Sequence, residues 1–166
     1  MTIYTIGYEG LNQKIFIACL KRYKISFLAD VRQRPLSRKK GFSKTAMTEM
    51  LLSENIKYKN FKELGTSKEM RDELYKSKNH NLFFNSYKKM IGDHQNQLDE
   101  LLDLINQGDN VALLCFEKDA NKCHRKIVAE EIKERDGNGM KIKHIQSSDF
   151  RHVRNSNTCI KKNIFY

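Results

Sequence analysis

Several features that are common in membrane and exported proteins are missing from this sequence of 166 residues. No apolar run approaches the roughly 20 residues that a membrane helix needs, so we expect no membrane partner. The first residues lack the charged, then apolar, then small-residue order of a signal peptide, and we therefore expect a cytoplasmic protein. In a reducing compartment the four cysteines would remain thiols or metal ligands rather than form disulfides. We find no internal repeat and no low-complexity segment.

Basic residues outnumber acidic ones, and one segment, residues 32–44, contains no acidic residue. Lys and Arg number 31 against 20 for Asp and Glu, which gives a net charge of +11 at pH 7. The segment from Arg32 to Lys44 has six cations, the only proline, one glycine and two serines, which favours a loop. Although such charge runs are often simply solvated, this one places Phe42 and hydroxyls among its cations, as phosphate-binding surfaces do. We therefore predict a nucleic acid or nucleotide partner, bound by Arg32, Ser37, Arg38, Lys39, Lys40 and Lys44.

The rest of the chain alternates between strand and helix patterns. Short apolar or alternating runs predict strands at 2–7, 25–29, 56–61, 111–115 and 140–145. Helical spacing predicts helices at 11–23, at 43–54 and from about Cys123 onward, and a helical insert at about 66–106. This alternation favours an α/β class: a single Rossmann-like domain over residues 1–146, with a mainly parallel sheet and helices on both faces. Residues 147–166 lose the periodicity and form a basic tail.

Polar residues follow three of the predicted strands. The carboxyl ends of parallel strands share one edge of a sheet, and open α/β folds bind ligands there. The polar residues are Tyr8 and Glu9 after the first strand, Asp30 and Arg32 after the second, and Cys115, Glu117, His124 and Arg125 at the fourth. We predict that all of them line one depression, with the basic loop at its rim.

The cysteines do not fit two common thiol chemistries. A cysteine phosphatase loop needs an arginine at a fixed spacing after its nucleophile, where this chain has Asn121. A thioredoxin-like centre needs Cys-x-x-Cys, whereas seven residues separate Cys115 from Cys123. Cys19 lies in the apolar stripe of a predicted helix, so we expect it to be a core residue.

Several roles remain open for the stretch from Cys115 to Arg125. Zinc would find ligands in Cys115, Cys123 and His124, with Glu117 or water as the fourth. Neighbouring side chains on a helix point about 100° apart, so Cys123 and His124 suit one ion poorly, and we expect less than one zinc per chain. Alternatively, a helix that begins near Cys123 would stabilise its thiolate, or Arg125 and nearby amides would bind an anion. A core role for Cys115 and a helix-capping role for His124 also remain possible.

Together these motifs resemble the bacterial and archaeal family known as domain of unknown function 488, also called YeaO-like. The matching residues are Thr5-Ile-Gly-Tyr-Glu-Gly10, Asp30-Val-Arg32 with Pro35, Ser37-Arg38, Gly41-Phe-Ser-Lys44, Ile56-Lys-Tyr58, Glu63-Leu-Gly65, Leu113-Leu-Cys-Phe-Glu117, and Cys123-His-Arg125 with Ala129. The resemblance covers roughly residues 2 to 145. It implies a Rossmann-like α/β domain with these motifs around one pocket, and it implies no activity. Phe116 departs from the family, where small residues are common.

Two functions of different classes follow from these patterns. The first is an enzyme that acts on a nucleotide or nucleic acid, with Glu9, Glu117 and His124 as candidate catalytic groups and Cys115 or Cys123 as an alternative nucleophile. In it, the basic loop and Arg125 hold phosphate, and Tyr8 and Asp30 contribute to substrate binding. The second is a non-catalytic nucleic-acid-binding module with a structural Cys/His cluster. The enzyme requires reactive residues in an open pocket, whereas the module requires only an exposed basic face.

Overall fold

One parallel sheet forms the centre of the molecule. The structure, a computed structural model, describes residues 1–146 and residue 149. The strands are β1 (Thr2–Gly7), β2 (Phe27–Asp30), β3 (Lys57–Asn60), β4 (Val111–Cys115) and β5 (Lys141–His144). Their order is β3-β2-β4-β1-β5, and each neighbouring pair is parallel. The α/β class and the Rossmann-like single domain are thereby confirmed. The basic tail predicted at 147–166 lies, apart from Asp149, outside the described residues.

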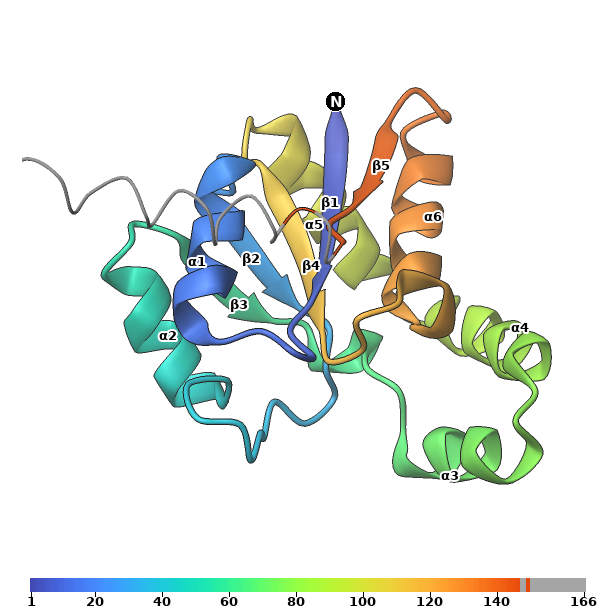
Figure 1. The fold of residues 1–166 in the computed structure, drawn as a ribbon. Coiled ribbons are helices and arrows are strands. Elements are labelled where there is room, and N and C mark those ends of the chain that lie inside the picture. Colours follow the sequence, from blue (N-terminus) through green and yellow to red (C-terminus); the bar gives the residue numbers. More distant parts are fainter. Residues whose placement is uncertain (147–148, 150–166) are drawn as a thin grey trace, which may run out of the picture.

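Helices cover both faces of this sheet (Figure 1). They are α1 (Gln13–Arg22), α2 (Lys44–Leu52), α3 (Lys68–Ser77), α4 (His80–Ile91), α5 (Gln95–Asn106) and α6 (Arg125–Arg135), with short 3-10 turns η1 (Lys62–Leu64) and η2 (Ala120–Lys122). Buried residues of α1 and α2 pack on one face, and those of α4, α5 and α6 pack on the other. None of the helices in the described ranges is both long enough and apolar enough to cross a membrane.

The central strand β4 has side chains in both cores. Val111, Leu113 and Cys115 belong to the core under α4, α5 and α6, whereas Ala112 and Leu114 belong to the core under α1 and α2. Such two-sided burial explains why this strand reads as an unbroken apolar run rather than an alternating one. The alternating pattern instead marks β3 and β5, the two edge strands, each with partly exposed residues.

The helical insert predicted at 66–106 corresponds to α3, α4 and α5. Helix α5 packs against the sheet through Leu98, Leu101 and Ile105. Helix α3 has no buried residue and projects beyond the carboxyl edge of the sheet (Figure 1). This projection carries polar side chains of α3 toward the loops that follow the strands.

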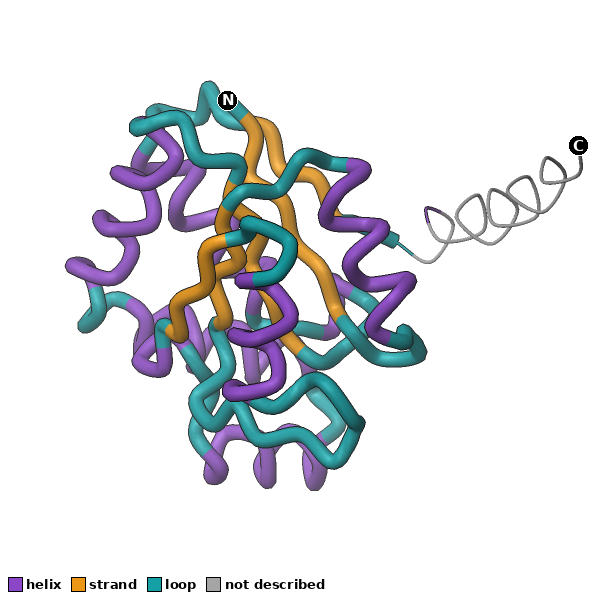
Figure 2. The backbone as a smooth tube through the Cα atoms, turned by 90° about the vertical axis from the view of Figure 1, so that its left-hand side faces the viewer, coloured by secondary structure: helices purple, strands orange, loops and turns teal. Residues whose placement is uncertain are grey.

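The loops at the carboxyl edge approach each other closely, and Figure 2 shows them gathered below the strands. A Cβ atom on Gly7 would lie 1.8 Å from the carbonyl oxygen of Glu117, and one on Gly65 would lie 2.0 Å from the amide nitrogen of Gln33. Only glycine therefore fits at either position without a shift of backbone. Both contacts join loops that surround the candidate site.

Candidate functional site

A cavity of about 460 Å³ opens at the carboxyl edge of the sheet. Its walls come from the loops after β1, β2 and β4 and from residues near the start of α3. Of the residues predicted from the sequence, the wall contains Tyr8, Arg32, Ser37, Arg38, Lys39, Cys115, Glu117 and His124. The parallel sheet thus brings together side chains that are far apart in the sequence.

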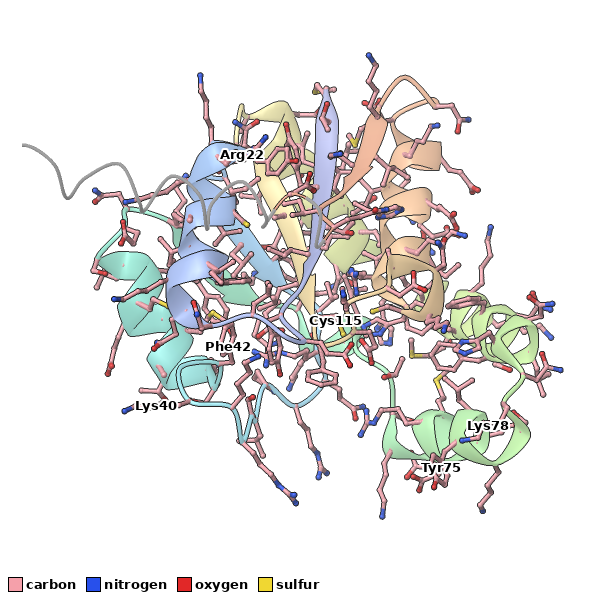
Figure 3. All side chains as sticks on the ribbon, viewed as in Figure 1. Arg22, Lys40, Phe42, Tyr75, Lys78 and Cys115 are labelled. Atoms are coloured by element: carbon pink, nitrogen blue, oxygen red, sulfur yellow. The ribbon has the colours of Figure 1, made fainter. Side chains whose placement is uncertain are left out.

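Six residues predicted as site residues lie outside the cavity wall: Glu9, Asp30, Lys40, Lys44, Cys123 and Arg125. For Glu9, Asp30 and Arg125 the prediction of one shared depression is therefore wrong. Figure 3 shows Lys40 on the part of the basic loop that lies away from Cys115. The wall also contains residues that were not proposed as site residues: Gln33, Arg34, Leu36, Thr66, Arg71 and Phe116. Arg34 belongs to the predicted basic loop, whereas Thr66 and Arg71 come from the insert, which has no recognisable motif.

Arg32 is held by the protein itself. Its Nε lies 2.8 Å from Asp30 Oδ1 and its Nη2 lies 2.6 Å from Asp30 Oδ2, and both residues are almost completely buried. Nη1 donates to the Tyr8 hydroxyl at 3.0 Å and to the Phe42 carbonyl at 2.9 Å. Burial opposes the charge of Arg32, but the hydrogen bonds and charge of Asp30 outweigh it and raise the pKa of the guanidinium. The Arg32 guanidinium, which we predicted to contact phosphate, is therefore already paired with Asp30.

Tyr58 completes this buried group. Its hydroxyl donates to Asp30 Oδ2 at 2.7 Å, and burial together with the Asp30 charge raises the pKa of the phenol. The Phe42 ring stacks on Tyr8 with 4.6 Å between centroids. Arg32 begins the basic loop and Phe42 lies near its end. The hydrogen bond from Arg32 to the Phe42 carbonyl therefore holds the two ends of the loop together.

The exposed part of the basic loop has cations without acidic partners. Arg34 and Arg38 are exposed, and among the described residues neither forms an ion pair. Lys39 is half-buried; its Nζ donates to the Tyr8 carbonyl at 3.2 Å and lies 5.5 Å from the Phe42 ring centroid. Arg71, on α3, lines the cavity and donates to the Thr66 carbonyl. Arg34 and Arg38 are thus exposed cations of the basic loop that also line the cavity.

At the end of β4, two thiols, a carboxylate and an imidazole meet. The Sγ atoms of Cys115 and Cys123 each lie 3.0 Å from Glu117 Oε2. His124 Nδ1 lies 3.9 Å from the Cys115 sulfur and 4.0 Å from the Cys123 sulfur. His124 Nε2 lies 2.8 Å from the Val31 carbonyl oxygen. Because a carbonyl only accepts, Nε2 carries a proton and Nδ1 faces the sulfurs. We call Cys115, Glu117, Cys123 and His124 the thiol cluster.

The backbone around Cys123 differs from the prediction in a way that matters for this cluster. Helix α6 begins at Arg125, so Cys123 is not in its first turn. Cys123 follows η2 in an extended conformation, with φ −128° and ψ 137°, and His124 is the N-cap residue, with φ −57° and ψ −24°. The angular spacing of a helix therefore does not apply to this pair. Both side chains lie close to the Cys115 sulfur, although we expected adjacent residues on a helix to suit one ion poorly.

Arg125 holds the loop after β4 instead of facing the cavity. Its side chain is completely buried. Nη1 donates to the Glu117 carbonyl at 2.5 Å, Nη2 to the Lys118 carbonyl at 3.2 Å, and Nε to Thr5 Oγ1 at 3.3 Å. Glu9 contacts the same loop, because its Oε2 accepts from the Lys118 amide at 2.8 Å. Two residues proposed to act on substrate thus position the loop that carries Glu117.

Burial and mutual contact shift the pKa values within the thiol cluster. Burial, together with the Cys123 charge, raises the pKa of Glu117. The hydrogen bond to Cys123 and burial raise the pKa of Cys115. For Cys123, burial acts in the other direction, but the bond from Cys115 and the charge of His124 lower its pKa. For His124, burial opposes the charge and the Cys123 thiolate outweighs it, so its pKa rises. These shifts arise from burial and from contacts within the cluster, so the protonation of each group depends on the others.

Comparison with known proteins identifies a family and nothing closer. A search of curated proteins finds no match, and neither does a search of solved structures. The family described as Domain of unknown function DUF488 matches residues 12–132. This match extends from just before α1 into α6 and includes the basic loop and the thiol cluster. Because it spans well over half of the 166 residues, the chain belongs to the DUF488 family.

Proposed function

We propose that this protein is an enzyme that acts on a nucleotide, with the phosphate bound by Arg34 and Arg38 and the chemistry carried out at Glu117. The observation that supports this proposal is that one cavity combines a cationic rim with a buried, reactive wall. A binding module needs only the rim. The two features together favour catalysis on an anionic substrate.

The charge balance of the cavity supports a phosphate ligand. Apart from Arg32, which Asp30 neutralises, the wall has four cationic side chains, Arg34, Arg38, Lys39 and Arg71, and Glu117 as the carboxylate. The exposed guanidiniums of Arg34 and Arg38 suit phosphate because their planar donors pair with two of its oxygens at once. Arg34 and Arg38 are exposed, whereas Glu117 lies beside the buried Cys115.

The size and the apolar part of the cavity support a nucleoside attached to that phosphate. A volume of about 460 Å³ falls within the range of small-ligand sites. Phe116 is 46% exposed, lines the cavity and meets Tyr8 edge to face at 5.3 Å between centroids. An exposed aromatic ring beside a cationic rim offers a stacking surface for a nucleobase. Phe116, a departure from the family pattern, would then set the base preference of this member.

We base the proposed chemical roles on the side chains that line the wall. Among the described residues that line the cavity, Glu117 is the carboxylate and Cys115 is the thiol. Arg125 and Glu9 hold the backbone of the loop that carries Glu117, through the Glu117 carbonyl and the Lys118 amide. We assign Glu117 as the general acid or base, and Cys115 as the alternative nucleophile. Since these roles require reduced thiols, we propose that the protein acts in the cytoplasm.

A turnover screen tests this proposal. The protein is incubated with ribo- and deoxyribonucleoside mono-, di- and triphosphates and with single-stranded oligonucleotides, and products are identified by mass spectrometry. We expect turnover of a nucleotide, reduced at least about 100-fold in Glu117→Gln. Glu49→Gln, which changes an exposed carboxylate on α2, serves as the control and should keep wild-type turnover. Binding of oligonucleotides without turnover of any compound would instead support the non-catalytic module.

A further inference from the structure

We propose that Cys115, Cys123 and His124 form a binding site for Zn²⁺, with the ion bordering the cavity beside Glu117. Nothing in the family description assigns a metal to these residues. The inference reverses the expectation of less than one zinc per chain. Binding of the ion does not depend on the proposed activity, although the ion would serve that activity if both are correct.

The distances within the cluster suit one tetrahedral ion. The two sulfurs and His124 Nδ1 all lie within 4.8 Å of one another. Zinc binds sulfur at about 2.3 Å and nitrogen at about 2.0–2.1 Å, and a tetrahedron with these bonds separates ligand atoms by roughly 3.5–3.8 Å. The sulfur-to-Nδ1 distances of 3.9 and 4.0 Å are close to this range. The cluster is therefore close to the geometry that one tetrahedral ion requires.

The surroundings of His124 orient it as a metal ligand. Its Nε2–H donates to the Val31 carbonyl at 2.8 Å, and the ring packs against Tyr87 at 5.2 Å between centroids. Metal-bound histidines commonly donate their second ring N–H to a carbonyl or carboxylate in this way, which fixes the tautomer and the ring orientation. Nδ1 is thereby directed at the two sulfurs before any ion arrives.

The donor set selects the kind of ion. Two thiolates and one imidazole favour Zn²⁺ over Mg²⁺ or Ca²⁺, which prefer oxygen ligands. Cys115 is at the end of β4 and Cys123 lies between η2 and α6, so the ligands come from well-anchored positions. All three ligands are buried.

The position of the cluster beside the cavity indicates that a bound ion would keep one coordination position open to water or substrate. Cys115 and His124 line the cavity, as does Glu117, whose Oε2 lies 3.0 Å from both sulfurs. An ion held by three protein ligands leaves a fourth position, which catalytic zinc sites fill with water or substrate. Here Glu117 is placed either to take that position or to exchange a proton with a water bound there. A closed structural site would instead have four protein ligands away from any cavity.

Metal analysis of the reduced protein tests the site directly. Protein kept under a thiol-free reductant is incubated with Zn²⁺ alone, passed through gel filtration and assayed by elemental analysis. We expect one zinc per chain in the wild type and in Cys19→Ala, which removes a buried thiol outside the cluster. We expect zinc to be lost in the double variant Cys115→Ser/Cys123→Ser. Zinc retained at one per chain by this variant would overturn the proposal.

A second measurement on the wild type removes any dependence on the folding of the variants. Co²⁺ is added to the reduced, metal-free protein, and the absorption spectrum is recorded. Thiolate-to-cobalt charge-transfer bands and intense tetrahedral bands are expected at one equivalent. Their absence, with all thiols shown to be reduced, would overturn the site. Nucleotide binding measured on the same metal-free protein separates the two proposals, because failure of the metal site leaves the phosphate contacts of Arg34 and Arg38 unchanged.

Discussion

Two buried polar clusters border the same cavity, and they differ in how completely the protein satisfies them. Around Asp30, the Arg32 guanidinium has Asp30, Tyr8 and Phe42 as partners, and Tyr58 also donates to Asp30 Oδ2. In the thiol cluster, two sulfurs share one oxygen of Glu117, and His124 Nδ1 lies 3.9 and 4.0 Å from them, at the long end of sulfur hydrogen bonds. The first cluster is closed by its own contacts, whereas the second is left open to the cavity.

The difference shows that a buried charge at the end of a strand is not by itself a functional signal. Asp30 and Arg32 occupy the position where parallel sheets bind ligands, yet their contacts are those of a structural ion pair. The thiol cluster occupies the equivalent end of β4, and its donors point at a common centre. We therefore assign stability to the Asp30 cluster and chemistry to the thiol cluster, and the predictions below test that division.

The largest effect on stability is expected from Asp30→Asn. This substitution leaves the buried Arg32 charge without its carboxylate, which costs about 3–5 kcal/mol in the free energy of unfolding. Urea denaturation measures the change. Lys62→Ala breaks the exposed pair with Glu63, 3.7 Å apart, and serves as the control, with an expected loss below about 1 kcal/mol. Equal effects of the two substitutions would remove the structural role assigned to Asp30.

Gly7→Ala is expected to lower both stability and turnover, with a smaller loss of stability than Asp30→Asn. The new methyl group would lie 1.8 Å from the Glu117 carbonyl oxygen, which also accepts from Arg125. The loop that carries Glu117 must move, so we expect a loss of about 1–3 kcal/mol together with loss of turnover. Gly139→Ala is the matched control, because its methyl group meets Asp136 Oδ2 at an ordinary 3.4 Å. A Gly7→Ala variant with full stability and turnover would show that this close approach does not position the site.

The smallest effect is expected from Tyr58→Phe. It removes one hydrogen bond to Asp30 and leaves the pair with Arg32 intact, so the free energy of unfolding should fall by about 1–1.5 kcal/mol. Nucleotide affinity, measured by calorimetry, should stay at the wild-type value because Tyr58 does not line the cavity. A large loss of affinity in this variant would place the Asp30 cluster in the binding site.

The strands, their parallel arrangement and the family follow from the sequence because they depend on patterns along the chain. The apolar run of β4 and the alternation of β3 are visible without coordinates. Parallel topology then brings Tyr8, Cys115 and Glu117 to one edge. These inferences need only the period of the side chains and the direction of the strands.

The partners of individual charges do not follow from the sequence. Arg32 is paired by Asp30 two residues earlier, but this depends on a loop that returns so that Phe42 and Tyr8 complete the arrangement. Arg71 reaches the cavity because α3 projects beyond the sheet, and no motif marks that projection. Helix α6 begins at Arg125, two residues later than periodicity predicts. Cys123 and His124 converge because they precede this helix. A helix boundary of this kind is decided by local backbone angles that periodicity does not resolve.

The most direct test of the account is a comparison of two pairs of cations in the basic loop. Nucleotide affinity is measured by calorimetry for Arg34→Ala/Arg38→Ala, which removes two wall residues, and for Lys40→Ala/Lys44→Ala, which removes two cations outside the wall. Both variants lose the same charge. Since charge-assisted contacts to phosphate are lost only in the arginine pair, we predict affinity at least about 10-fold weaker there and within about 2-fold of wild type in the lysine pair. Equal weakening in both variants, or none in the arginine pair, would contradict a phosphate site at this cavity.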